Sequence, residues 1–159
     1  MTTVAFHSGV ADKLGYSCRL LRKAWRAGSR VLVVGSVEQL ARLDALLWQF
    51  EPGEFIPHVR LRAGQTVTPL LARTPIWLVD EPTGFIAGPF SATAAAPDVL
   101  VNLGPAMVAD VERFARVIEV VADTPDELGS GRQRWRAHVA AGLSPSNLPQ
   151  AAQPPKHTA

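Results

Sequence analysis

The fold is predicted from one stretch of the chain, residues 30–58, RVLVVGSVEQLARLDALLWQFEPGEFIPH. The stretch opens with the apolar run 31–34, rich in β-branched residues, which is typical of a short strand covered on both faces. Gly35 then turns the chain, and Ser36 with Gln39 forms the capping-box signature of a helix start. The apolar residues that follow are spaced as one face of a helix: Leu40, Leu43, Leu47 and Phe50. A strand that enters a helix through two residues is half of a βαβ unit.

The length and composition predict one soluble domain. The chain has 159 residues, of which 47% are hydrophobic, enough for a single substantial core. Its apolar runs are far shorter than the roughly 18 residues of a membrane span, and its first residues lack the pattern of a signal peptide. The single cysteine, Cys18, excludes an internal disulfide and a cysteine-based zinc site, as in a reducing compartment. We therefore expect a cytoplasmic protein without membrane contact.

The charge of the chain is unevenly distributed. The net charge is only +2, but residues 1–73 carry ten Lys and Arg against five Asp and Glu, whereas residues 74–159 carry six against nine. From residue 128 onward there are three Arg, one Lys and no acid. A basic patch of this size suits an acidic peptide at least as well as a nucleic-acid backbone, which favours a broader stripe.

Strand and helix patterns alternate along the chain. Strands are predicted over residues 2–7, 31–34, 59–61, 76–79, 99–103 and 117–121. Helices are predicted over residues 11–27, 36–50, 105–114 and 124–142, the last one loose until Arg132 because of Gly129 and Gly131. Right-handed crossovers make the first two strands parallel neighbours or near neighbours. The pattern predicts a three-layer, Rossmann-like α/β domain with a mostly parallel sheet flanked by helices.

Two segments are predicted to lack regular structure. Residues 84–97 are rich in Gly, Ala and Pro and are interpreted as an irregular connection. Residues 144–159, SPSNLPQAAQPPKHTA, are polar and rich in proline, which is typical of a disordered tail. The predicted domain therefore covers residues 1–143.

The patterns that carry catalysis or cofactor binding are weak in this sequence. Neither of the first two strand–helix turns has a G-x-G-x-x-G set, and there is no Walker loop. The four histidines, His7, His58, His138 and His157, do not form a metal-binding spacing. The alternative of a small nucleotide-binding enzyme depends on Gly35 and on the carboxylates of Asp80 and Glu81 at a strand end. Acids at such positions are more often turn residues, so we expect no active site and no cofactor.

The last helix carries the best candidate binding site. Arg132, Trp135, Arg136 and Val139 fall on one helical face, and two guanidinium groups beside an indole can hold a carboxylate together with an apolar side chain. The alternative is that Trp135 and Val139 pack into the core while the arginines are solvated, and the pattern alone favours this alternative.

The run LDALLWQFEPGEFIPH over residues 43–58, after the strand and helix described above, closely resembles the chi subunit of bacterial DNA polymerase III holoenzyme. The resemblance extends over roughly residues 3–142. It implies a Rossmann-like fold and a non-catalytic accessory subunit that connects the clamp-loader complex to single-stranded DNA-binding protein, with nucleic acid contacted only indirectly.

The resemblance also implies two partner sites. The segment RQRWRAHVAAG, residues 132–142, is similar to the chi helix that binds the acidic, phenylalanine-ending C-terminal tail of single-stranded DNA-binding protein, and it places Arg132, Trp135 and Arg136 at matching positions. It departs just upstream, where DELGSG lacks a lysine common in the family and Thr124 replaces an aliphatic residue.

The second implied site lies at the end of the helix in residues 36–50. Trp48 and Phe55 match the residues of chi where the psi subunit, or an alternative helicase partner, docks. Two aromatics beside a prolyl turn also suit an interaction hot spot. His58 is interpreted as a structural hydrogen-bonding residue, and Cys18 as core packing.

Overall fold

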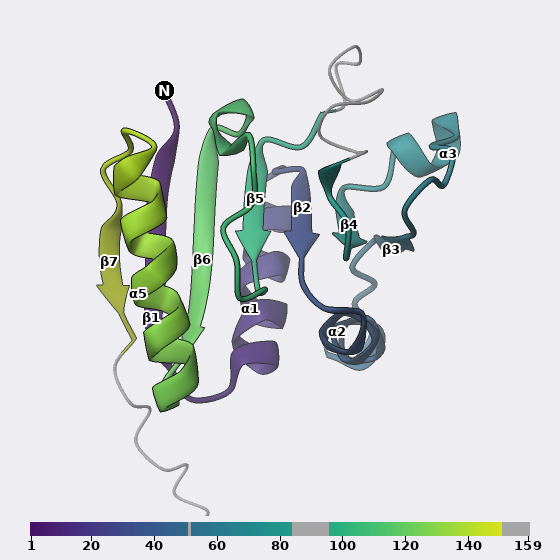
Figure 1. The fold of residues 1–159 in the computed structure, drawn as a ribbon. Coiled ribbons are helices and arrows are strands. Elements are labelled where there is room, and N and C mark those ends of the chain that lie inside the picture. Colours follow the sequence, from purple (N-terminus) through teal and green to yellow (C-terminus); the bar gives the residue numbers. More distant parts are fainter. Residues whose placement is uncertain (51, 84–95, 151–159) are drawn as a thin grey trace, which may run out of the picture.

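A single parallel sheet forms the centre of the molecule (Figure 1). The computed structural model describes residues 1–50, 52–83 and 96–150. Within these ranges seven strands pair in the order β3-β4-β2-β5-β6-β1-β7, and every pair is parallel. The strands are β1 (Thr3–Val10), β2 (Val31–Val34), β3 (His58–Leu61), β4 (Ile76–Val79), β5 (Val99–Asn102), β6 (Arg116–Ala122) and β7 (Ser146–Pro149). The predicted Rossmann-like class is confirmed.

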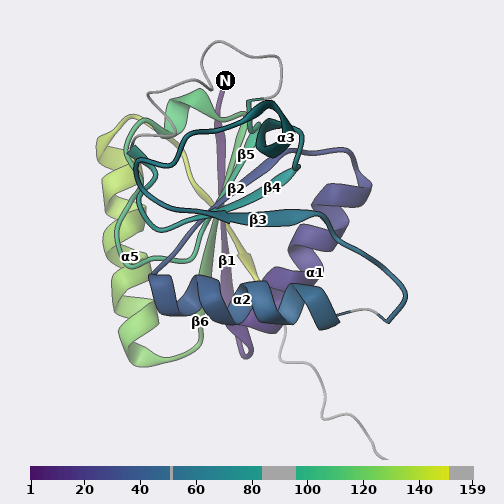
Figure 2. The ribbon, with the colours of Figure 1, turned by 90° about the vertical axis from the view of Figure 1, so that its right-hand side faces the viewer.

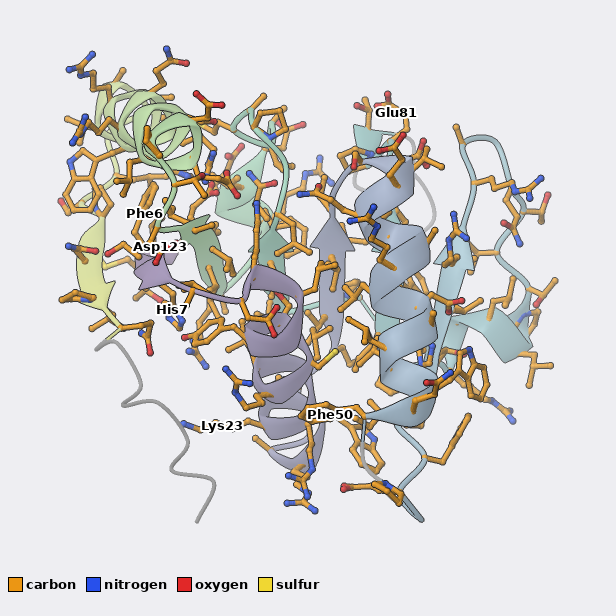
Figure 3. The ribbon with its side chains drawn as sticks, turned by 90° about the horizontal axis from the view of Figure 1, so that it is seen from below. Phe6, His7, Lys23, Phe50, Glu81 and Asp123 are labelled. Atoms are coloured by element: carbon orange, nitrogen blue, oxygen red, sulfur yellow. The ribbon has the colours of Figure 1, made fainter. Side chains whose placement is uncertain are left out.

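Helices cover both faces of the sheet. On one face lie α1 (Lys13–Arg26) and α2 (Val37–Gln49), and on the other lie α3 (Pro69–Ala72), the 3₁₀ turn η2 (Val111–Arg113) and α5 (Pro125–Ala140). Figure 2 looks onto the β3 edge of the sheet and shows α2 running beside that edge. Figure 3 shows Phe6 of β1 on the side of α5 and the next residue, His7, on the side of α1. Three layers result, as predicted.

The central strands are apolar because both of their faces are covered. All four residues of β2 are buried, and so are all four of β4 and of β5. Successive side chains alternate between the layers, so that Val31 and Val33 pack with α1 and α2 while Leu32 and Val34 pack on the other face. Continuous burial therefore accounts for the unbroken apolar runs.

The predicted start of α2 is confirmed in atomic detail. Ser36 is the N-cap, its Oγ accepts a hydrogen bond from the backbone N–H of Gln39, and the Gln39 side chain accepts one from the Ser36 N–H. This capping box satisfies two of the backbone donors that a helix start leaves free. Leu40, Leu43 and Leu47 are buried against the sheet, as their spacing predicted.

The predicted helix over residues 105–114 is wrong. The structure forms only the short turn η2 there, after Asp110 adopts a left-handed backbone conformation with φ of 58°. The Asn102 side chain holds the preceding turn, because its Oδ1 accepts from the Gly104 N–H and its Nδ2 donates to the Ala106 carbonyl. Three buried apolar residues anchor this segment: Val108, Val111 and Phe114.

The predicted tail boundary at residue 144 is also wrong. Ser146–Pro149 forms β7, which pairs in parallel with β1 at the edge of the sheet. The polar composition misled the prediction, because an exposed edge strand needs no apolar face and pairs through its backbone. Residues 151–159 of the predicted tail, and most of the connection over 84–97, lie outside the described residues.

Three smaller predictions are corrected. The segment after β3 contains the short helix α3, capped by Thr68. β1 and β2 are parallel but are separated by β6 and β5, so they are not neighbours. α5 is continuous from Pro125. Gly131 lies close to β6, where an added Cβ would stand 3.1 Å from the Val121 methyls. The glycine allows close packing here and does not loosen the helix.

Candidate partner-binding sites

A pocket of about 530 Å³ lies between α5 and the β1–β7 edge of the sheet. We call it the α5 pocket. It contains all three residues predicted on the last helix, Arg132, Trp135 and Arg136. The other lining residues come from four elements: Phe6 and Ser8 of β1, Val121 of β6, Leu128 and Gly131 of α5, and Asn147 of β7.

The α5 pocket has an apolar interior and a cationic rim. Trp135 is half-buried, and its ring centroid lies 5.1 Å from that of Phe6. Arg132 and Arg136, one helical turn apart, are exposed, and neither forms an ion pair with a described residue. Val139 is exposed and does not line the pocket, so the predicted face ends at Arg136. This arrangement can accept an apolar side chain against the indole while two guanidinium groups face a carboxylate.

The β7 wall of the α5 pocket was not predicted. Ser8 Oγ lies 2.6 Å from Asn147 Oδ1, and the Gln150 N–H donates to the Ser8 carbonyl at 2.8 Å. Gly9 follows with φ of 68°, and a Cβ there would lie 3.3 Å from the Gln150 carbonyl oxygen. The segment after α5 is thereby fixed against β1. Its sequence SNLP carries no periodic signal that could have identified it.

A buried polar network fixes α5 on the sheet and was also missed. The Glu119 carboxylate of β6 accepts hydrogen bonds from Arg134 Nε at 2.8 Å and from Asn102 Nδ2 at 3.3 Å, and its Oε1 lies 2.9 Å from His138 Nε2. Arg134 Nη1 donates to Ser130 Oγ within α5. The signal was present in the sequence, because a glutamate inside the apolar strand RVIEVVA requires a buried partner. Arg134 and His138, four residues apart, supply it.

The network sets which residues of α5 face the solvent. Arg134 and His138 are buried against β6, so Arg132 and Arg136 are turned toward the α5 pocket and the solvent. Arg134 is inside the core and Arg132 and Arg136 are outside it. Of the three arginines in residues 132–136, one is therefore structural and two are accessible to a ligand.

The second predicted site is an exposed aromatic cluster at the end of α2. Trp48 is 57% exposed and Phe55 is 58% exposed, and their ring centroids lie 5.2 Å apart. The centroid of the His58 ring lies 4.9 Å from that of Trp48. We call Trp48, Phe55 and His58 the aromatic patch. Large apolar side chains this exposed are typical of a contact surface.

His58 is a structural residue, as predicted. It is buried, its Nδ1 is 2.7 Å from the Ile56 carbonyl oxygen, and its Nε2 is 3.0 Å from Asp44 Oδ1 without the alignment of a hydrogen bond. These contacts tie the start of β3 to α2. The His58 ring thus packs against the indole of Trp48 from a fixed position.

The loop that presents Phe55 is anchored on both sides. Glu54 forms ion pairs with Arg22 and Arg26 of α1, at 2.9 and 3.0 Å. Ile56, which follows Phe55, is buried in the core with α1 and α2. Phe55 is therefore held outward between two fixed neighbours.

The residues considered for catalysis do not form one site. Gly35 is enclosed, because a Cβ there would lie 3.1 Å from Gln39 Oε1 and 3.4 Å from the Leu103 Cβ. Asp80 lines a separate pocket that does not include Gly35. Among the described residues, no group of three or more His, Cys, Asp or Glu side chains is placed to hold a metal ion. Likewise, none of the described helices is long and apolar enough to cross a membrane.

The described histidines and the cysteine have separate structural surroundings. His7 contacts the Tyr16 hydroxyl, His58 lies beside Asp44, and His138 lies beside Glu119. Burial raises the pKa of the Cys18 thiol to about 11, so this side chain stays protonated at neutral pH and packs as a small hydrophobe.

Comparison with known proteins identifies relatives along nearly the whole chain. A family model described as "DNA polymerase III chi subunit, HolC" matches residues 1–146. The DNA polymerase III subunit chi of Pseudomonas aeruginosa is 30% identical over 158 residues, covering 94% of this chain and 99% of that protein. The subunit chi of Escherichia coli strain K12 is 26% identical over 128 residues, covering 80% of this chain and 78% of that protein.

A solved structure with the same fold is distant in sequence. The C-terminal domain of S. cerevisiae Dbp5, solved with Gle1 and IP6, matches with a TM-score of 0.57 at 9% identity, covering 96% of this chain and 92% of that one. At this identity the likeness concerns the α/β fold alone.

Proposed function

We propose a function from one premise, that this chain belongs to the DNA polymerase III chi subunit family. Membership makes it an accessory subunit whose partners lie within the polymerase complex. We propose that it acts as a non-catalytic adaptor, which links the clamp-loader complex to single-stranded DNA-binding protein through two separate surfaces. The observation that carries the proposal is the α5 pocket, where Arg132, Trp135 and Arg136 line one cavity.

The proposed ligand of the α5 pocket is an acidic peptide that ends in phenylalanine, such as the C-terminal tail of single-stranded DNA-binding protein. A terminal phenylalanine carries an aromatic ring and a carboxylate on the same residue. The half-buried Trp135, backed by the buried Phe6, offers an apolar contact for the ring, and the two exposed guanidinium groups offer partners for the carboxylate and for acids upstream. The stretch 126–131, DELGSG, lacks the lysine that is common in the family. Leu128 of this stretch adds apolar lining to the pocket and no charge.

Titration of the purified protein with such a peptide tests this proposal. We expect a dissociation constant in the micromolar range that rises with salt, because exposed charges are screened. Arg132→Ala and Arg136→Ala should each weaken binding severalfold, whereas Arg42→Ala, an exposed arginine on α2 outside the pocket, should not. A peptide that lacks the terminal phenylalanine should also bind weakly. Wild-type affinity in both pocket variants would overturn the assignment.

The proposed surface for the clamp-loader side is the aromatic patch. Its partner is the psi subunit of that complex, or an alternative helicase. The patch lies on α2 and the loop before β3, whereas the α5 pocket lies at the opposite edge of the sheet (Figure 1). Two partners can thus bind at the same time, which an adaptor requires. Trp48→Ala should abolish co-purification with the clamp-loader complex while leaving peptide binding at the α5 pocket intact.

A further inference from the structure

A second pocket, of about 500 Å³, lies at the α2 and β3 edge of the sheet. Val37 and Leu40 of α2 form one wall, and Arg60 of β3 and Arg62 just after it form another. Its remaining lining includes the buried Leu61 and Leu78 and the exposed Asp80. We call it the edge pocket.

The edge pocket and the aromatic patch share one side of β3. Side chains two residues apart in a strand point to the same face, so Arg60 continues the row that begins at His58, and Arg62, just after β3 ends, lines the same pocket as Arg60. At about 3.3 Å per residue, the two arginines lie about 7 and 13 Å beyond His58. α2 runs along this row (Figure 2), with Trp48 beside His58 and Val37 beside the arginines.

The charges at the two ends of this row differ. The aromatic patch is apolar, whereas Arg60 and Arg62 are exposed and form no ion pair with a described residue. Asp80 lines the same pocket, but its carboxylate is not paired with either arginine. The pocket therefore holds two cations against one anion. An arriving carboxylate would balance its charge.

We propose that the edge pocket is a second, electrostatic part of the clamp-loader docking surface. Its occupant is an acidic side chain of the same partner segment whose apolar side chain covers Trp48 and Phe55. In the partner, the two groups are separated by about four residues if the segment is extended, or by about nine if it is helical. This inference rests on the proposed role of the aromatic patch and adds the chemistry and spacing of its partner.

The test measures binding of the full-length chain to the purified clamp-loader complex of the same organism at two salt concentrations. Arg60→Glu/Arg62→Glu should weaken binding about tenfold at low salt and flatten its salt dependence, because surface charges act on encounter and orientation. Asp80→Asn should strengthen binding, since it removes the one negative charge that lines the pocket with the two arginines. The matched control Arg42→Glu/Arg73→Glu makes the same change in net charge at exposed arginines outside the edge pocket.

The outcomes separate this inference from the proposed function. Wild-type affinity of Arg60→Glu/Arg62→Glu, together with loss of binding by Trp48→Ala, would overturn the edge-pocket inference and leave the aromatic patch intact. Equal weakening by the control pair would also overturn it, because the effect would then be one of overall charge. Absence of binding by the wild-type chain would contradict the proposed function, and the inference would fall with it. Circular dichroism of each variant verifies the fold.

Discussion

The Nε atom of Arg134 lies 2.8 Å from Oε2 of Glu119, and both side chains are only 1% exposed. This ion pair connects α5 to β6 inside the core. We predict that Glu119→Gln destabilises the protein by about 3–5 kcal/mol, because it leaves the Arg134 charge buried without its counterion. Urea unfolding measures the loss. The double variant Glu119→Met/Arg134→Met should be less destabilised than Glu119→Gln, and a larger loss in the double variant would contradict this account.

We predict that β7 is required for the α5 pocket. Removing residues 144–159 deletes Asn147 from the pocket wall and exposes the backbone of β1, so the acidic peptide should bind several times more weakly. Isothermal titration of the shortened chain measures the change. Removal of residues 151–159 alone is the control, and it should leave binding as in the full chain.

The two tryptophans Trp48 and Trp77 should respond differently to truncation. Trp77→Ala should cost about 3–5 kcal/mol, because this side chain is 1% exposed in the core beneath α3. Trp48→Ala should change the free energy of unfolding by less than about 1 kcal/mol, because the ring is mostly exposed. Thermal and urea unfolding compare the two. A loss for Trp48→Ala as large as that for Trp77→Ala would make Trp48 a core residue and remove the aromatic patch.

Stability should decrease on mild acidification, in part through His7. Burial is the main cause that lowers the pKa of His7 in the folded protein, and Arg116 and Lys23 lower it further. In the unfolded chain a histidine has a pKa of about 6.5, so below that pH the unfolded state binds a proton that the folded state resists. The His7 contribution is therefore complete above pH 6.5 and is lost as the pH falls through the lower folded pKa.

Calorimetry of the wild type and of His7→Gln between pH 7.5 and 5 checks this prediction. The melting temperature of the wild type should fall more steeply than that of the variant as the pH decreases. Parallel curves for the two proteins would mean that protonation of His7 does not contribute to the pH dependence of stability.

Nucleotides should not stabilise the protein. A ligand present at a hundred times its dissociation constant raises the free energy of unfolding by about 2.7 kcal/mol, which a thermal shift detects easily. Because Gly35 is enclosed and Asp80 faces a different pocket, we expect no shift with adenine or guanine nucleotides. A clear shift would revive the nucleotide-binding alternative.

The sequence predicted those elements whose apolar pattern reflects burial. The strand before Gly35, the capping box at Ser36 and the leucine stripe of α2 are local features, and all three are present in the structure. Helical spacing placed Arg132, Trp135 and Arg136 on one face of α5, and the resemblance to the chi family favoured a binding site there; all three line one pocket. Local periodicity was sufficient wherever one element buries one face.

The features that the sequence did not predict depend on contacts between distant residues. β7 forms because its backbone pairs with β1, which is about 140 residues earlier in the chain, and no side-chain pattern records this. Gly131 was predicted to weaken the helix, but in the structure it allows α5 to pack closely against Val121 of β6. The helix predicted after Pro105 failed because the Asn102 side chain fixes a different turn. The buried position of Arg134 was predictable, because Glu119 in an apolar strand requires a buried cation as its partner.

The pairing of β1 with β7 determines when the α5 pocket can exist. A ribosome that adds about 5–20 residues per second takes roughly 7–28 s to make the chain between these strands. Until that time Phe6 and Ser8 have been synthesised but Asn147 has not, so the cavity lacks a wall. A nascent chain that has not reached β7 therefore lacks a complete α5 pocket. In the proposed function, only a chain synthesised through β7 can therefore bind the acidic tail.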